Sequence, residues 1–163
     1  MLTIAILIYA SAMTLANLSV AAFGPAVIPF NAFVLIGLDL ALRNWLALKL
    51  KAPQMLLLIA VSAGLSYALN PASGQIALAS FVAFSVSAIA DWLTFRTITG
   101  QWLRRCVGGV TVGAAVDSVL FPTIAFGSLL PMLVLAQFVA KVAGGFMWAW
   151  IISRATRLRV RLP

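Results

Sequence analysis

Residues 107–126 read VGGVTVGAAVDSVLFPTIAF, an apolar run interrupted by a single carboxylate, Asp117. A helix needs about 20 apolar residues to cross a hydrocarbon core of about 30 Å, so this run is long enough to span a membrane. Asp117 lies near the middle of the run. A charge at that depth is costly, normally faces the interior of a helix bundle and marks a substrate or ion path. The stretch predicts a membrane protein with a polar site inside its bundle.

The composition of the whole chain agrees with this reading. With 64% hydrophobic and 9% charged residues and a mean hydropathy of +1.12, the chain has too little polar surface for a water-soluble globule, so we expect its main surroundings to be a lipid bilayer. The net charge of +8 comes from short basic clusters between apolar runs, and we therefore expect no nucleic-acid binding. With one cysteine and no histidine, we expect no disulfide, metal, cofactor, catalytic residue or enzymatic activity.

The same length argument, applied along the chain, predicts an all-α membrane protein with six transmembrane helices in a single domain, residues 1–163. The breaks contain glycine, proline or several charges. The spans are expected at about 3–23, 27–43, 53–70, 75–95, 107–126 and 130–153. Because the connections are short, consecutive helices should be antiparallel neighbours.

Lysine and arginine occur in every second connection, which predicts the orientation. The basic clusters are Arg43 to Lys51, Arg96 to Arg105, and the tail with Arg154, Arg157, Arg159 and Arg161. Because such residues are retained in the cytoplasm, both termini are expected there. The first span could instead be a cleaved signal peptide, but it has no basic segment before it. Trp45, Trp102 and Trp150, at predicted helix ends, are typical of the aromatic belts at membrane interfaces.

The polar residues fall into two layers when their depth is counted from the helix ends. Asp117 and Lys141 are both near the midplane and can form an ion pair. Asn17 and Asn31 lie in the outer half, where they can bind a ligand or hydrogen-bond between helices.

Two further carboxylates lie about one turn from the cytoplasmic face. Asp39 has Arg43 four residues later, and Asp91 has Arg96 five residues later. We interpret these as ion pairs with a structural or gating role.

Several residues share a helix face with these charges. Phe84 lies on the face of Asp91, Phe121 on the face of Asp117, and Gln137 and Trp148 on the face of Lys141. The predicted substrate-binding residues are therefore Asp117, Lys141, Asn17, Gln137, Phe121, Asn31, Phe84 and Trp148.

Four strings of sequence, LANLSVAAFG (15–24), FNAFVLIGLDLALRN (30–44), ASFVAFSVSAIADWLTFRTITGQWLRR (79–105) and GAAVDSVLFPTIAFG (113–127), resemble the VUT family of vitamin uptake transporters. These six-helix proteins are known chiefly as queuosine precursor transporters. The resemblance implies uptake of a 7-deazaguanine, such as 7-cyano-7-deazaguanine, across the bacterial inner membrane. It also implies a bundle like the substrate-binding subunit of energy-coupling factor transporters.

The positions that match the family's motifs are Asn17, Asp39, Asp91, Phe95, Asp117, Ser118, Phe121 and Lys141. The pair Arg43-Asn44 departs from the acidic or basic pair that is expected there in many relatives.

A guanine-like edge offers adjacent N–H donors and a carbonyl acceptor, which a carboxylate and a cationic or amide donor can satisfy together. We expect Asp117 to accept from the donors, and Lys141, Gln137 or Asn17 to face the acceptor. Phe84, Phe121 or Trp148 would stack on the ring.

Other functions remain open at this point. The chain has no phosphate-binding loop, so it could be a binding subunit, for another vitamin-like solute, that needs a separate energising complex. An intramembrane enzyme with paired carboxylates, or a structural or pore-forming protein, are further alternatives. Proton coupling through Asp39 or Asp91 and assembly into a homo-oligomer are also open.

Overall fold

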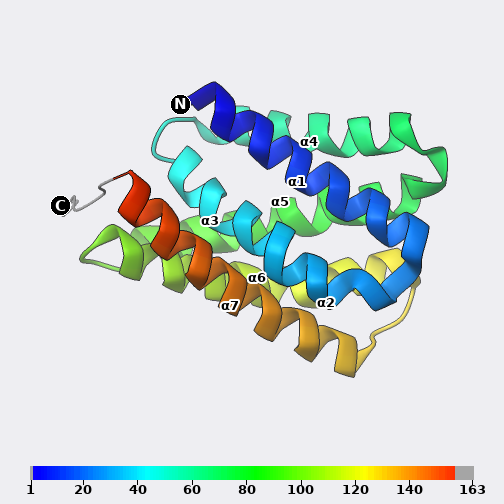
Figure 1. Ribbon diagram of the computed structural model, residues 1–163. Coiled ribbons are helices and arrows are strands. Elements are labelled where there is room, and N and C mark those ends of the chain that lie inside the picture. The colour runs from blue at the N-terminus through cyan, green and yellow to red at the C-terminus, as the bar shows by residue number, and fades with distance from the viewer. Residues whose placement is uncertain (1, 157–163) are drawn as a thin grey trace.

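The computed structural model describes residues 2–156, which form helices and connections without any strand. Figure 1 shows the helices running side by side along one direction. They are α1 (Leu2–Phe23), α2 (Ile28–Asn31), α3 (Gly37–Leu46), α4 (Ala52–Leu69), α5 (Gly74–Thr97), α6 (Trp102–Phe126) and α7 (Pro131–Ala155). The 3-10 helices η1 (Gly24–Val27) and η3 (Pro71–Ser73) join helices, and the π-helix η2 (Ala32–Ile36) joins α2 to α3.

Five helical segments within residues 2–156 are long and apolar enough to cross a membrane. The first of them, Leu2–Leu46, is not a straight rod. The chain reverses at η1, where Gly24 has a φ of 71° that other residues rarely adopt. After this reversal α2 and α3 run back beside α1 (Figure 1), and Asn31 Nδ2 donates to the carbonyl of Ala16 at 3.4 Å. Two of the predicted spans therefore fall within this one segment.

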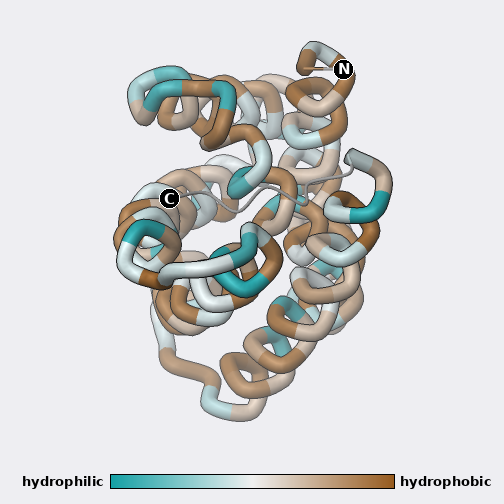
Figure 2. Tube along the Cα trace, turned by 90° about the vertical axis from the view of Figure 1, so that its left-hand side faces the viewer, coloured by the Kyte–Doolittle hydropathy of each residue, from teal (hydrophilic) through white to brown (hydrophobic). Residues whose placement is uncertain are grey.

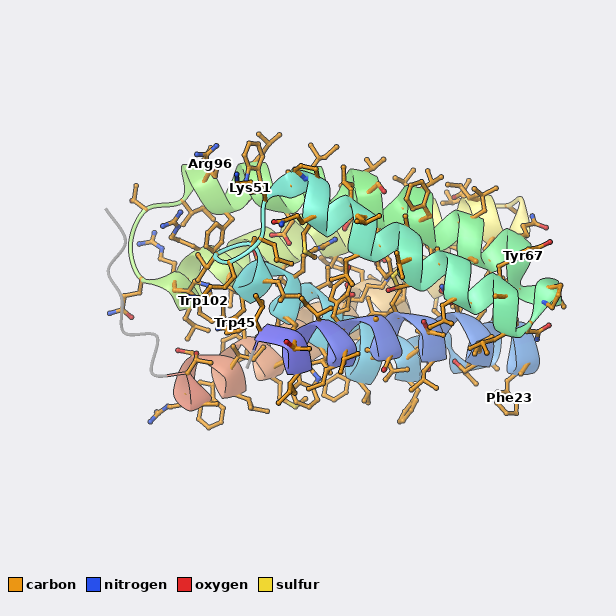
Figure 3. The ribbon with its side chains drawn as sticks, turned by 90° about the horizontal axis from the view of Figure 1, so that it is seen from above. Phe23, Trp45, Lys51, Tyr67, Arg96 and Trp102 are labelled. Atoms are coloured by element: carbon orange, nitrogen blue, oxygen red, sulfur yellow. The ribbon has the colours of Figure 1, made fainter. Side chains whose placement is uncertain are left out.

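The two ends of the bundle differ in charge. The start of α1, the α3–α4 and α5–α6 connections and the end of α7 lie together at one end (Figure 1). We call it the basic end, because it carries Lys49, Lys51, Arg96, Arg104 and Arg105. Figure 3 shows Lys51 and Arg96 there, with Phe23 and Tyr67 at the opposite, neutral end. Arg157, Arg159 and Arg161 of the predicted cytoplasmic tail lie outside the described residues.

Away from the basic end, many large apolar side chains face outward, and the charged ones face inward. Leu57 and Val139 are 64% and 57% exposed, whereas the three carboxylates and Lys141 are all 2% exposed or less. Figure 2, seen from the basic end, shows mostly hydrophobic helices with hydrophilic stretches in the connections at that end. This distribution suits a protein that is solvated by lipid, because only the interior offers partners to a charge.

The predicted span 27–43 differs from the structure. The helix continues to Leu46, and it contains the π-helix η2 where a regular α-helix was expected. This wide turn packs directly on α7: a Cβ built at Gly144 would lie 2.0 Å from the carbonyl oxygen of Phe33. The indole Nε1 of Trp148 donates to the carbonyl of Val34 at 3.0 Å. The irregular turn therefore lies where this helix contacts α7. The sequence of residues 27–43 does not by itself predict these contacts.

The interfacial role predicted for the tryptophans is wrong for two of them. Trp45 and Trp102 are only 9% and 1% exposed, so they pack inside the basic end rather than against lipid. Figure 3 shows both at that end. Trp150 is 47% exposed, and the guanidinium of Arg154 lies 5.3 Å from its ring. The position of a tryptophan near a helix end therefore did not show whether its side chain faces lipid or packs between helices.

We predict that Gly144→Ala destabilises the protein by about 1–3 kcal/mol, because the added methyl group would overlap the backbone of η2. Gly64→Ala is the matched control, since a Cβ at Gly64 meets nothing within 4 Å. The control should be neutral, or stabilising by up to about 1 kcal/mol through helix propensity. Thermal unfolding in detergent would measure both, and equal melting temperatures would contradict the predicted close contact.

Candidate functional site

A small cavity lies between α1, α2, η2, α5, α6 and α7. Asn17, Ser80 and Gln137 each lie six residues from the neutral end of their helix, which places the cavity about 9 Å from that end. Seven of the eight predicted substrate-binding residues line it: Asn17, Asn31, Phe84, Asp117, Phe121, Gln137 and Lys141. The fold thus brings together residues that are spread over more than a hundred positions of sequence.

The buried ammonium group of Lys141 is held by three acceptors. Its Nζ lies 2.6 Å from Asp117 Oδ2, 2.7 Å from Gln137 Oε1 and 3.3 Å from Ser118 Oγ. These bonds use all three donors of the group. Gln137 is fixed in turn, because its Nε2 donates to the carbonyl of Ser118 at 2.7 Å. The ion pair expected between Asp117 and Lys141 is therefore present, within a closed set of hydrogen bonds.

The second oxygen of Asp117 has no such partner. Oδ1 is buried and accepts no hydrogen bond from any of residues 2–156, although Asp117 lines the cavity. A buried acceptor without a donor costs about 1–3 kcal/mol, and more when it is charged. Such an atom on a cavity wall is suited to accept a hydrogen bond from a bound molecule.

The two asparagines are hydrogen-bonded between helices. Ser80 Oγ donates to Asn17 Oδ1 at 2.5 Å, and Asn17 Nδ2 donates to Ser66 Oγ at 3.3 Å. Asn31 Nδ2 donates to Ser19 Oγ at 2.6 Å. The hydrogen bonds between helices that were predicted for these residues are therefore present. The same side chains also line the cavity, and their binding of a ligand stays a prediction.

Aromatic rings from α5 and α6 form part of the wall. Phe84 is buried, and Phe121 packs edge to face with Phe126 at a centroid distance of 6.4 Å. Trp148 is the predicted site residue that does not line the cavity. It lies about two turns beyond Lys141 on α7, where its indole donates a hydrogen bond to η2. Lys141 and Trp148 share a helix face but not a site, because this face of α7 extends beyond the cavity.

A second polar cluster lies nearer the basic end and corrects the predicted ion pairs. Arg43 pairs with Asp91 at 3.4 Å, and not with Asp39. Its Nη2 also donates to Ser87 Oγ at 3.2 Å, and its Nη1 to the carbonyl of Phe84 at 3.3 Å. Arg43 thus reaches across from α3 to α5, and sequence spacing within one helix could not predict this.

The predicted pair of Asp91 and Arg96 is also wrong. A residue five positions further along a helix is turned by about 140°, so Arg96 points away from Asp91. It is exposed, and its guanidinium lies 4.7 Å from the ring of Trp92. Asp91 instead accepts two bonds from Asn44 Nδ2, at 3.0 and 3.2 Å.

Sequence reasoning missed two members of this inner region. Asn44 was noticed only as a departure from the expected pair, although it is the residue that holds Asp91. Gly109 on α6 makes room for that carboxylate, since a Cβ there would lie 2.0 Å from Asp91 Oδ1. A small residue facing a buried charge is a weak signal in one sequence, because glycine is common in membrane helices.

A second, larger cavity lies between α3, α4 and α5. Arg43, Asn44 and Asp91 provide its polar wall, and apolar side chains such as Met55 and Phe95 provide the rest. Ala47 and Ala52 extend it to the basic end. Among residues 2–156, no group of three His, Cys, Asp or Glu side chains is close enough to hold a metal ion.

We predict that Lys141→Met destabilises the folded protein by about 3–5 kcal/mol, because it leaves the buried Asp117 without its counter-charge. Adding Asp117→Asn should recover part of that loss by removing the isolated charge. Lys49→Met, at an exposed position of the basic end, is the control and should change little. Chemical unfolding in mixed micelles would measure the series, and equal stability of the two lysine variants would refute the prediction.

Comparison with known proteins supplies one match. The family model described as "Putative vitamin uptake transporter" matches residues 3–155. Neither the curated proteins nor the solved structures provide a match. The family match covers nearly the whole chain and includes both polar clusters. The chain therefore belongs to this family of membrane transporters, and its apolar helices are those of a multi-pass membrane protein.

Proposed function

We propose that this member of the vitamin uptake transporter family imports a small, flat nitrogen heterocycle, and that its substrate is a 7-deazaguanine such as 7-cyano-7-deazaguanine. The observation that carries the proposal is the buried Oδ1 of Asp117, which has no donor among residues 2–156 and lies on a cavity wall. A guanine-like edge presents N–H donors of the kind that this oxygen lacks.

The other groups around the cavity suit the same ligand. Lys141 makes its longest hydrogen bond, 3.3 Å, to Ser118, and the carbonyl oxygen of a ligand can replace that partner. Ammonium and carboxylate would then bind neighbouring atoms of one heterocyclic edge. Phe84 and Phe121 offer apolar faces for the ring. The cavity is narrow, so these side chains must move apart to admit the ring.

The direction of transport follows from the proposed topology. We infer six membrane crossings, with the reversal at η1 on the outer side and the basic end in the cytoplasm, because lysine and arginine are retained there. In a bacterium the membrane would be the inner membrane. The first cavity then lies in the outer half of the bundle, and the second cavity opens toward the cytoplasm.

Arg43 lies between these two cavities. It lines the second cavity and donates to the carbonyl of Phe84, whose side chain lines the first. We assign Arg43, Asp91 and Asn44 as the inner gate that substrate must pass after leaving the first cavity. The gating role that was inferred from the sequence for Arg43 and Asp91 is thus retained, although the two residues pair with each other.

We predict that Asp117→Asn weakens binding of 7-cyano-7-deazaguanine by about tenfold to a hundredfold, the effect of losing hydrogen bonds to a charged acceptor. Asp91→Asn is the matched control, because Asp91 does not line the first cavity. Its affinity should stay near that of the wild type. Calorimetry on detergent-purified protein would measure both, with guanine and a water-soluble vitamin as competing ligands.

Equal affinities of the two variants would remove Asp117 from the binding site. Failure of the wild-type protein to bind any deazaguanine would refute the proposed substrate. Binding without uptake by the purified protein in liposomes would instead indicate a binding subunit that needs an energising complex.

We predict that a cysteine at position 72 reacts with a membrane-impermeant maleimide on intact bacterial cells, and that a cysteine at position 49 reacts only after permeabilisation. Ala72 and Lys49 are exposed at opposite ends of the bundle. The native Cys106 is fully buried and should give little background. Labelling of both variants from the same side would contradict six crossings.

A further inference from the structure

The charges buried among residues 2–156 do not balance. Three carboxylates and two cations are nearly inaccessible inside the bundle. Lys141 pairs with Asp117 and Arg43 pairs with Asp91, which leaves Asp39 without a counter-charge. The side chain of Asp39 is fully buried, and neither of its oxygens accepts a hydrogen bond from the described part of the chain.

Titratable and charged groups on each of the neighbouring helices lie close enough to influence Asp39 electrostatically. They are Tyr9 on α1, Asp91 on α5, Asp117 on α6, Lys141 on α7, and Arg43 on α3 itself. Both cations already serve other carboxylates. The hydroxyl group of Tyr9 is fully buried, lies next to Asp39 and also lacks a hydrogen-bond partner within residues 2–156. Asp39 and Tyr9 are thus two unsatisfied groups that face each other.

An ionised carboxylate without a partner is among the most expensive groups to bury, whereas a neutral carboxylic acid carries a donor of its own. The oxygen of Tyr9 is an acceptor placed beside that donor. We propose that Asp39, facing Tyr9, is a proton-binding site that holds one proton in this conformation and couples substrate movement to the proton gradient. The coupling rests on the proposed transport function, but the proton site does not.

The geometry also indicates how the proton would act. Arg43 lies one turn after Asp39 on α3, so an ionised Asp39 would attract it. Arg43 can leave Asp91, because their contact is long, 3.4 Å, and Asn44 continues to hold both oxygens of Asp91. Movement of Arg43 toward Asp39 would open the inner gate. The proton released by Asp39 would pass to water in the second cavity on the cytoplasmic side, and a proton taken up from the outer side would let Arg43 return to Asp91.

Infrared spectroscopy tests the proton site without any substrate. At neutral pH the wild-type protein should show the carbonyl stretch of a protonated carboxylic acid, with the expected shift in heavy water. Asp39→Asn should lack this band and should unfold at a temperature no lower than the wild type. Asp91→Asn should weaken the band, because the freed Arg43 can pair with an ionised Asp39. Asp117→Asn, the control, should keep the band, because it leaves Arg43 on Asp91. Absence of the band from the wild type, or its persistence in Asp39→Asn, would overturn the proposal.

Proteoliposomes test the coupling with 7-cyano-7-deazaguanine. The wild type should accumulate this compound when a proton gradient is imposed. Asp39→Asn should bind it with wild-type affinity, but should neither accumulate nor exchange it, because a neutral side chain at this position cannot draw Arg43 from Asp91. If the wild type binds and equilibrates the compound regardless of the proton gradient, or responds to a sodium gradient instead, the coupling is wrong and the proposed function stands. If the wild type does not bind it, the proposed function fails, and the infrared result alone decides the proton site.

Discussion

The burial of an ion pair in the middle of a lipid-facing bundle is the constraint on which the rest of the structure depends. Lys141 and Asp117 are held together at 2.6 Å, and water is not available at that depth to solvate either of them. Every remaining donor of Lys141 must therefore find an acceptor inside the protein, and Gln137 and Ser118 supply these. These requirements turn α6 and α7 so that their polar faces meet, and they place the cavity against the pair.

Close contact between helices makes this arrangement possible. Lipid tails are as apolar as leucine, so helices in a membrane associate through backbone contact and hydrogen bonds more than through hydrophobic burial. Gly144 lets α7 touch η2, and Gly109 lets α6 approach Asp91. The glycines thus close the bundle around both polar clusters, and a side chain at either position would separate the helices that supply their partners.

The two cavities differ in what lines them. The first, toward the neutral end, has amides, the Ser80 hydroxyl group and the Asp117–Lys141 pair among largely apolar side chains. The second, toward the basic end, is largely apolar and has a single polar wall. The only cation in that wall, among the residues that the structure describes, is Arg43, and its neighbour Asp39 is the buried carboxyl group that has no counter-charge. Substrate binding and energy coupling would then use separate carboxylates that lie close enough to influence one another.

The sequence by itself determined the features that depend on the length and composition of the apolar runs and on the depth of polar residues within them. Apolar runs of about 20 residues predict membrane helices, and counting along two of them placed Asp117 and Lys141 at one level, where they do pair. Five polar residues of the predicted site reach one cavity for a related reason, since polar groups in lipid must turn inward. Phe84 and Phe121 reach the same cavity from α5 and α6.

Only the tertiary structure decided which neighbours each charge meets. Arg43 pairs with Asp91 and not with Asp39. The indole of Trp148 donates to η2, and the amide of Asn44 donates to Asp91. These choices depend on how helices rotate and how closely they approach. Contacts between distant segments fix both, and the spacing of residues within one helix carries no information about them.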